Sequence, residues 1–126
     1  GLESGLMILQ YVAAALIAEL HVLSNPASTS NVPVSMGKED HASMGATGTY
    51  RALKSTMLLS QVISNEMICS AEALENIHEK PGSGVEKVTK WVRTHVSSLQ
   101  GDRSMTDECE SLANAMLDGE FNRIFE

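Results

Sequence analysis

A long apolar segment, residues 6–23, limits the folds that this sequence can adopt. Gln10, Glu19 and His21 interrupt it and no basic flank precedes it, so it fits neither a transmembrane helix nor a signal peptide. A helix that is apolar nearly all round needs neighbours on every side, as in the middle of a bundle. In a single small chain it would be underburied. The segment therefore predicts an oligomer, or packing against a larger partner domain.

The composition favours helix over sheet. The chain has 126 residues, enough for one domain with a real core. Only 4% of the residues are aromatic while Ala and Met are frequent, and these residues favour helices more than strands. No convincing pair of strands and no internal repeat is visible. The predicted fold class is all-α.

Hydrophobic periodicity and helix breakers predict where the first helices lie. Residues 5–24 form the first, and Pro26 and Pro33 place a loop over 25–37. The second is long and runs from residue 39 or 42 to residue 77, because apolar residues recur there at three- to five-residue steps. These two long helices, with the loop 25–41 between them, form one part of the predicted domain, residues 1–78.

Shorter amphipathic helices are predicted for residues 84–126 of the same domain. The turn Lys80–Gly84 precedes a third helix that ends at Gly101 and has an apolar stripe of Val85, Val88, Val92, Val96 and Leu99. A fourth begins near Ser104, whose spacing to Asp107 makes a weak variant of the capping box. Its apolar face continues through Leu112, Met116, Phe121 and Ile124.

Charge and cysteine content exclude several functions. A formal net charge of −7 argues against nonspecific nucleic-acid binding, which needs a basic surface. Cys69 and Cys109 are far apart in the sequence, so we expect neither a disulfide framework nor a zinc site. We expect instead that both thiols are reduced and that the chain is cytoplasmic. The histidines have no metal-ligand spacing, and no hydrolase or nucleotide-binding motif is present. We expect no metal, no membrane and no nucleic acid as partners.

The triplet Glu39-Asp40-His41, between Gly37 and Gly45, is the best candidate for chemistry. At a predicted helix start, backbone N–H groups and the helix dipole would keep the Glu39 carboxylate ionised. Such a group can bind a cationic ring or act as an acid or base. The alternative is that these acids only stabilise a helix N-terminus, as first-turn acids commonly do.

Several short blocks follow one another in a distinctive order. They are Gly1-Leu2-Glu3-Ser4-Gly5-Leu6-Met7-Ile8, Ala13-Ala14-Ala15-Leu16, Pro26-Ala27-Ser28, and Glu39-Asp40-His41 followed by Ser43-Met44-Gly45. Taken in this order, the blocks resemble the histidine ammonia-lyase family within the aromatic amino-acid ammonia-lyases. Asp102-Arg103 is similar to a further landmark of that family near the last helices.

The resemblance implies an electrophile that this sequence does not contain. Members of the family use a methylidene-imidazolone, made from an internal Ala-Ser-Gly, to eliminate ammonia and give a trans-2-alkenoate such as urocanate from histidine. The 126 residues hold no Ala-Ser-Gly, since Ala27-Ser28 is followed by Thr29. We expect the cofactor to form in an upstream segment of the same enzyme and this chain alone to be inactive. The start at Gly1, directly before a helix, is expected of a fragment.

By resemblance, Glu39 is the active-site glutamate beside the substrate imidazole, and Met7 is the position that separates histidine from phenylalanine and tyrosine enzymes. Both favour an amino-acid substrate, L-histidine. Gly37, Lys38 and Asn25 depart from the residues common in the family. Tyrosine or phenylalanine lyases, an aminomutase, and a non-catalytic helical assembly module remain alternatives. The resemblance also implies a homotetramer whose active sites draw residues from three subunits.

Overall fold

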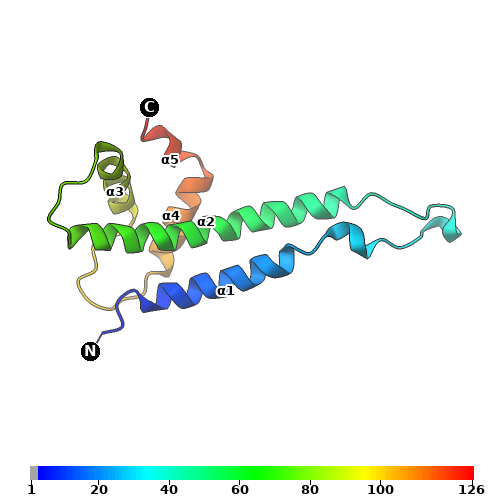
Figure 1. Ribbon diagram of the computed structural model, residues 1–126, viewed down its shortest axis with the longest axis horizontal. Coiled ribbons are helices and arrows are strands. Elements are labelled where there is room, and N and C mark those ends of the chain that lie inside the picture. Colours follow the sequence, from blue (N-terminus) through cyan, green and yellow to red (C-terminus); the bar gives the residue numbers. More distant parts are fainter. Residues whose placement is uncertain (1–2) are drawn as a thin grey trace.

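A computed structural model describes residues 3–126, and this part of the chain is all-helical, as the sequence predicts (Figure 1). Two 3-10 turns, η1 (Ala27–Ser30) and η2 (Ser35–Gly37), lie in the loop between the first two helices, and no strand occurs in the described range. The α-helices are α1 (Met7–Leu23), α2 (Gly45–Glu75), α3 (Ser83–His95), α4 (Thr106–Leu117) and α5 (Glu120–Arg123).

The long helices α1 and α2 form an antiparallel hairpin, with the loop 24–44 projecting from its far end (Figure 1). Inside the hairpin, the buried amide of Asn65 donates a hydrogen bond to the backbone carbonyl of Leu9, with 3.4 Å between Nδ2 and O. Lys54 and Glu19 form an ion pair at 2.7 Å on its surface. Exposed pairs of that kind stabilise little, so apolar packing holds the hairpin together.

The hydrophobic core lies at the end of the hairpin that is remote from the loop. There, α3 and α4 pack on the second half of α2, and Ile68, Val92, Val96 and Leu112 are fully buried. Small residues on α2 let α4 come close, and the Ser64 hydroxyl donates to the Cys109 carbonyl oxygen at 2.9 Å. At this end of the molecule four helices enclose a hydrophobic core, whereas at the other end α1 and α2 pack only against each other and the loop between them.

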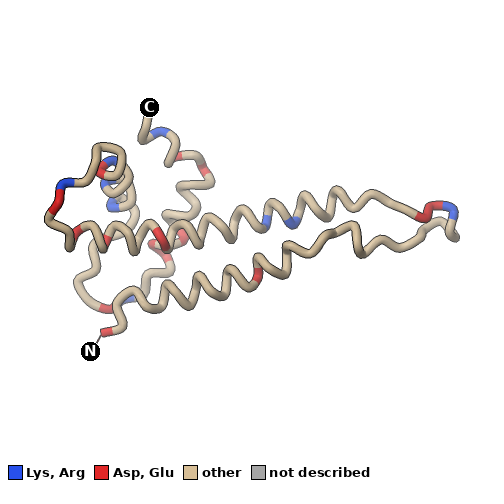
Figure 2. Tube along the Cα trace, viewed as in Figure 1, with Lys and Arg blue, Asp and Glu red and all other residues tan. Residues whose placement is uncertain are grey.

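Much of the apolar surface of α1 and of the first half of α2 is exposed in the single chain. Leu9 is the one buried residue of α1 within the described range. Figure 2 shows that charged residues gather at the loop tip and around the C-terminal helices and are sparse in between. The large apolar residues on this surface that are more than half exposed are Ile8, Tyr11, Val22, Tyr50, Leu53 and Met57. A single copy therefore leaves α1 underburied, as predicted.

None of the described helices is long and apolar enough to cross a membrane.

The third helix is shorter than predicted. It ends at His95, because Val96 adopts an extended backbone with φ −131° and ψ 118°. Val96 is nevertheless fully buried and Leu99 packs against the core. Four members of the predicted apolar stripe thus belong to the core or pack against it, whereas Val85 is exposed. The last two members lie on a linker, residues 96–105, and not on a helix.

The fourth helix begins close to the predicted position, at Thr106, but its predicted cap and its predicted continuation were wrong. Met105 precedes its first turn without any side-chain cap, so the proposed capping box of Ser104 and Asp107 does not form. At the other end Gly119, with φ +79°, breaks the helix after Leu117. Phe121 therefore lies on the separate short helix α5.

Candidate functional site

The loop between α1 and α2 carries the predicted triplet at its tip. Val34 and Glu39 pair through two backbone hydrogen bonds, of 2.8 Å from Val34 N to Glu39 O and 3.3 Å from Glu39 N to Val34 O. The chain between them turns through three consecutive left-handed residues, Ser35, Met36 and Gly37, with φ of 53°, 57° and 79°. The tip is therefore a closed hairpin-like turn at the end of the molecule farthest from the core (Figure 1).

The backbone of this tip is strained. A left-handed conformation costs a non-glycine residue about 1–2 kcal/mol, and both Ser35 and Met36 adopt it. The Met36 side chain is 96% exposed, so no burial in the single chain offsets this cost. Strained, exposed turns of this kind are characteristic of functional segments.

Glu39 does not lie at a helix start, contrary to the sequence-based argument. The helix α2 begins only at Gly45, so its dipole and free N–H groups do not hold the carboxylate. The Ser35 hydroxyl does, donating to Glu39 Oε1 at 3.3 Å. The late start of α2 is explained by the pairing of Asn31 with Ala42. The Asn31 side-chain amide donates to the Ala42 carbonyl oxygen and accepts from the Ala42 N–H. That pairing keeps the residues before Gly45 out of the helix.

Met7 and Glu39 lie at opposite ends of the hairpin. Met7 is the first residue of α1 and is 50% exposed, while Glu39 lies in the loop beyond the last residue of that helix. A helix of 17 residues is about 25 Å long. One copy of the chain thus does not bring together the two residues that the resemblance assigns to substrate binding.

A hollow lies beside the triplet. It has a volume of about 480 Å³, opens widely to solvent, and is lined by Ser28, His41 and residues 42–45. Of the triplet, His41 alone lines it. Its backbone and hydroxyl groups could face a polar ligand, but the hollow is shallow and holds no charged side chain in the described part of the chain.

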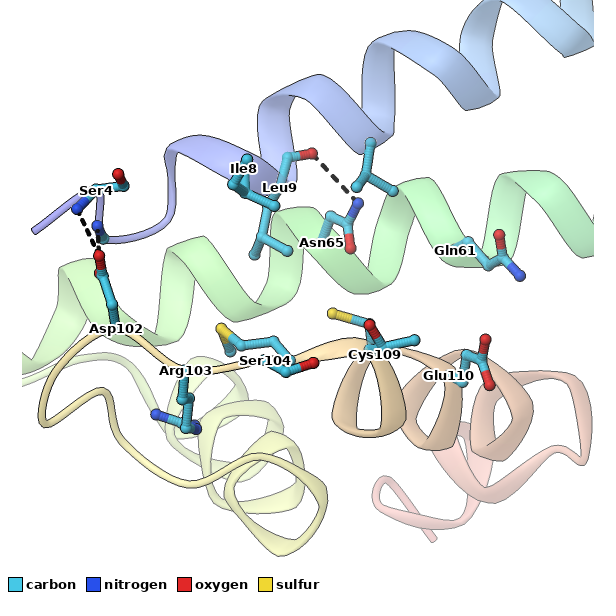
Figure 3. Close-up of a pocket in the computed structure, with 14 residues that line it drawn as sticks. Ser4, Ile8, Leu9, Gln61, Asn65, Asp102, Arg103, Ser104, Cys109 and Glu110 are labelled. Atoms are coloured by element: carbon cyan, nitrogen blue, oxygen red, sulfur yellow. Dashed lines mark hydrogen bonds between the residues drawn. The ribbon is translucent and has the colours of Figure 1, made fainter.

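A larger cavity, of about 560 Å³, lies where the start of α1 meets α2 and the linker 96–105 (Figure 3). Its apolar wall comes from Ile8, Leu9 and Val12 of α1, and Asn65 of α2 points into it. No pattern in the sequence predicted this cavity. The one signal for it was Asp102-Arg103, which lies on the linker side of the cavity.

Residues 3–126 contain neither a cluster of side chains suited to a metal ion nor a reactive thiol. No group of three or more His, Cys, Asp or Glu side chains lies close enough to hold a metal ion. Burial raises the pKa of both the Cys69 and the Cys109 thiol, and a thiol with a raised pKa is a poor nucleophile near neutral pH.

Comparison with known proteins identifies similar sequences and structures. The aromatic amino acid lyase family profile matches residues 1–94. The histidine ammonia-lyase of Deinococcus radiodurans is 38% identical over 124 residues, which cover 98% of this chain and 24% of that enzyme. The histidine ammonia-lyase of Symbiobacterium thermophilum is 38% identical over 121 residues, covering 95% of this chain and 24% of that enzyme.

Solved structures resemble the fold closely. The crystal structure of histidine ammonia-lyase from Trypanosoma cruzi matches with a TM-score of 0.90 and 27% identity, over 98% of this chain and 25% of that one. Tyrosine aminomutase from Streptomyces globisporus matches with a TM-score of 0.92 and 32% identity, over 98% and 24%. The chain spans about a quarter of the length of the curated relatives that it matches.

Proposed function

Because the chain belongs to the aromatic amino acid lyase family, we propose that it is the C-terminal part of a histidine ammonia-lyase. The reaction is the non-oxidative elimination of ammonia from L-histidine to give urocanate. The observation that carries this proposal is the identity of 38% with a histidine ammonia-lyase along nearly the whole chain.

In this proposal Glu39 contacts the substrate and Met7 helps to select it. An exposed carboxylate on a closed turn can accept a hydrogen bond from an imidazole ring, or exchange a proton with it. The Met7 side chain is flexible and apolar, and half of it is free to contact another molecule. Glu39 thus acts as the catalytic and substrate-binding residue, and Met7 shapes the pocket for the side chain.

The electrophile of the family does not form from this chain. The two Ala-Ser pairs, Ala27-Ser28 and Ala42-Ser43, are followed by Thr29 and Met44, so no Ala-Ser-Gly is available to cyclise. When present in the complete enzyme, a methylidene-imidazolone activates the amino acid for loss of ammonia. We assign it to an upstream segment of the same enzyme and expect this chain alone to be inactive.

The separation of Met7 from Glu39 supports an oligomer, which we propose to be a cytoplasmic homotetramer. A site containing both residues needs a second copy of the chain, since they lie at opposite ends of one hairpin. The exposed apolar surface of α1 provides a face for that contact. Residues 1–78 would then form the central bundle, with the loop 25–41 at the active site and residues 84–126 outside it.

The main alternative is an enzyme that acts on tyrosine or phenylalanine. The tyrosine aminomutase structure matches this fold as well as the histidine ammonia-lyase structure does. Gly37, Lys38 and Asn25, around the same loop, depart from the residues common in the family, which leaves the substrate open. The amino acid that is consumed distinguishes the histidine enzyme from these alternatives. The product then distinguishes a lyase, which releases ammonia and an unsaturated acid, from an aminomutase, which returns a β-amino acid.

The proposal is tested by joining this chain to an upstream segment that contains Ala-Ser-Gly. We expect urocanate absorbance from L-histidine, lost in the variant Glu39→Ala and kept in the control Glu79→Ala, an exposed acid near the end of α2. Activity on tyrosine alone would support the alternative substrate. If the joined protein assembles but acts on none of these amino acids, the chain is a helical assembly module. A stable monomer in light scattering would contradict the tetramer.

A further inference from the structure

A single carboxylate, that of Asp102, joins the segment before α1 to the linker 96–105. Asp102 accepts a hydrogen bond from the Ser4 N–H on Oδ2 and one from the Gly5 N–H on Oδ1, each at 2.8 Å (Figure 3). These bonds join residues 98 and 97 positions apart in the sequence. Gly5 has φ +56°, and such a turn aims successive N–H groups at one anion. The contact is therefore a complete two-donor cradle for the Asp102 carboxylate.

No neighbouring side chain caps the N-terminus of α1. Leu6 precedes the helix without a side-chain cap, and the first turn contains no acidic residue. The free N–H groups and the positive end of the dipole at a helix start favour a negative charge nearby. Asp102 supplies that charge, since its carboxylate binds Ser4 and Gly5, which precede the first helical residue, Met7.

Asp102 is itself held in place by the neighbouring Arg103, whose side chain turns the other way (Figure 3). The guanidinium donates to the Ser97 carbonyl oxygen at 2.7 Å and to Glu108 at 3.1 and 3.2 Å. The Ser97 N–H donates to the same carboxylate at 3.0 Å. The linker is thus tied to α4, and Asp102 transmits that fixed position to the start of α1.

We propose that Asp102 is a positioning residue that fixes Met7 and thereby the fit of the substrate side chain. This inference rests on the proposed function for the role of Met7, but the anchoring itself does not. Without the carboxylate, residues 3–6 lose both bonds to the linker, and the first turn of α1 is free to move. The hydrophobic core is far less affected, because Ile68 and Leu112 lie deeper between α2 and α4.

The anchoring is measured by amide hydrogen exchange and methyl NMR on the complete protein that carries this segment. In Asp102→Ala we expect amide exchange of Ser4 and Gly5 to rise about ten-fold, as for other locally opened amides. The Met7 methyl signal should shift, while the methyl signals of Ile68 and Leu112 stay in place. Asp102→Glu keeps the carboxylate and should restore part of the protection. Asp118→Asn is the matched control, an exposed acid at the end of α4. Unchanged exchange and an unchanged Met7 signal would overturn the proposal.

The consequence for the substrate is measured on the complete lyase that carries this segment. Asp102→Ala should raise KM for L-histidine about ten-fold and change kcat less than about two-fold, because a loosened binding contact acts mainly on KM. A purely structural role would lower the amount of active enzyme and hence kcat, with KM unchanged. That result would overturn the positioning role. If the wild-type lyase shows no activity, the proposed function fails, while amide exchange still upholds or overturns the anchoring.

Discussion

The carboxylate of Glu108 holds the linker 96–105 against α4, and a substitution there measures how much this attachment stabilises the fold. It accepts hydrogen bonds from Arg103 Nε and Nη2 and from the Ser97 N–H, and its side chain is 22% exposed. We predict that Glu108→Gln loosens the linker, because a neutral amide has one acceptor oxygen in place of two and cannot form the ion pair.

The expected loss of stability follows from these contacts. Hydrogen bonds to charged groups contribute about 1.5–3 kcal/mol each when buried, whereas exposed ion pairs contribute about 0.2–1 kcal/mol. For a partly buried pair with one backbone donor we expect a loss of about 1.5 kcal/mol in the free energy of unfolding. In a domain of this size that lowers Tm by roughly 5 °C. Thermal unfolding followed by circular dichroism measures it, with Glu110→Gln, an exposed acid on the same helix, as the control.

The effect must also depend on pH in one direction. The hydrogen bond from Arg103, with help from the Ser97 N–H, holds the pKa of Glu108 below its ordinary value. A group whose pKa is lower in the folded state stabilises the fold above its unfolded pKa, and this contribution is lost as the pH falls through its folded pKa. Wild type and Glu108→Gln should therefore differ near neutral pH and converge in acid, once the pH has fallen through the lowered pKa of Glu108. Equal Tm values near neutral pH, or a gap that persists in acid, would refute the reasoning.

Three further predictions concern the core, the turns and the thiols. Leu112→Ala should cost about 2–5 kcal/mol, because Leu112 is fully buried, whereas Leu117→Ala, at a site 43% exposed, should cost far less in the same denaturant titration. Gly119→Ala should destabilise by about 1 kcal/mol, since φ is +79° there, while Gly48→Ala inside α2, where an added Cβ meets nothing within 4 Å, should stabilise the chain by up to about 1 kcal/mol. Calorimetry measures the change in Tm of each variant. A higher Tm for Gly119→Ala, or a lower one for Gly48→Ala, would contradict the role given to backbone conformation. The Cys109 thiol should react with Ellman's reagent more slowly in the folded chain than in denaturant, because burial raises its pKa. Equal rates would show that it is not shielded.

The helices were predictable because their apolar periodicity is local. The positions of α1 and α2 follow from the spacing of apolar residues and from Pro26 and Pro33. The structure has both helices within a few residues of the predicted ends, apart from the start of α2. The end of α3 was not predictable in this way. Val96 continues the stripe in space although its backbone is extended, and periodicity cannot distinguish a buried linker residue from a helical one.

The site could be predicted only as a set of residues. Glu39 was recognised by its chemistry, but the pairing of Asn31 with Ala42 that keeps it off the helix joins two side-by-side loop segments, and no sequence spacing indicates it. The same holds for Asp102, which was visible as a landmark but whose contacts with Ser4 and Gly5 span most of the chain. Contacts between distant loops depend on the packed fold, which a local pattern does not encode.

The buried amide of Asn65 has a consequence for how α1 and α2 find each other during folding. The facing surfaces of the two helices are largely apolar, and apolar surfaces can slide past one another with little change in free energy. Asn65 is 95% buried and donates to the Leu9 carbonyl oxygen. A shift of α1 by about half a turn, roughly 2.7 Å, would carry that carbonyl away and leave a buried amide without its acceptor, which costs about 1–3 kcal/mol. Shifts by whole turns avoid this cost because they bring another backbone carbonyl to the same place, so Asn65 limits α1 and α2 to a few discrete registers.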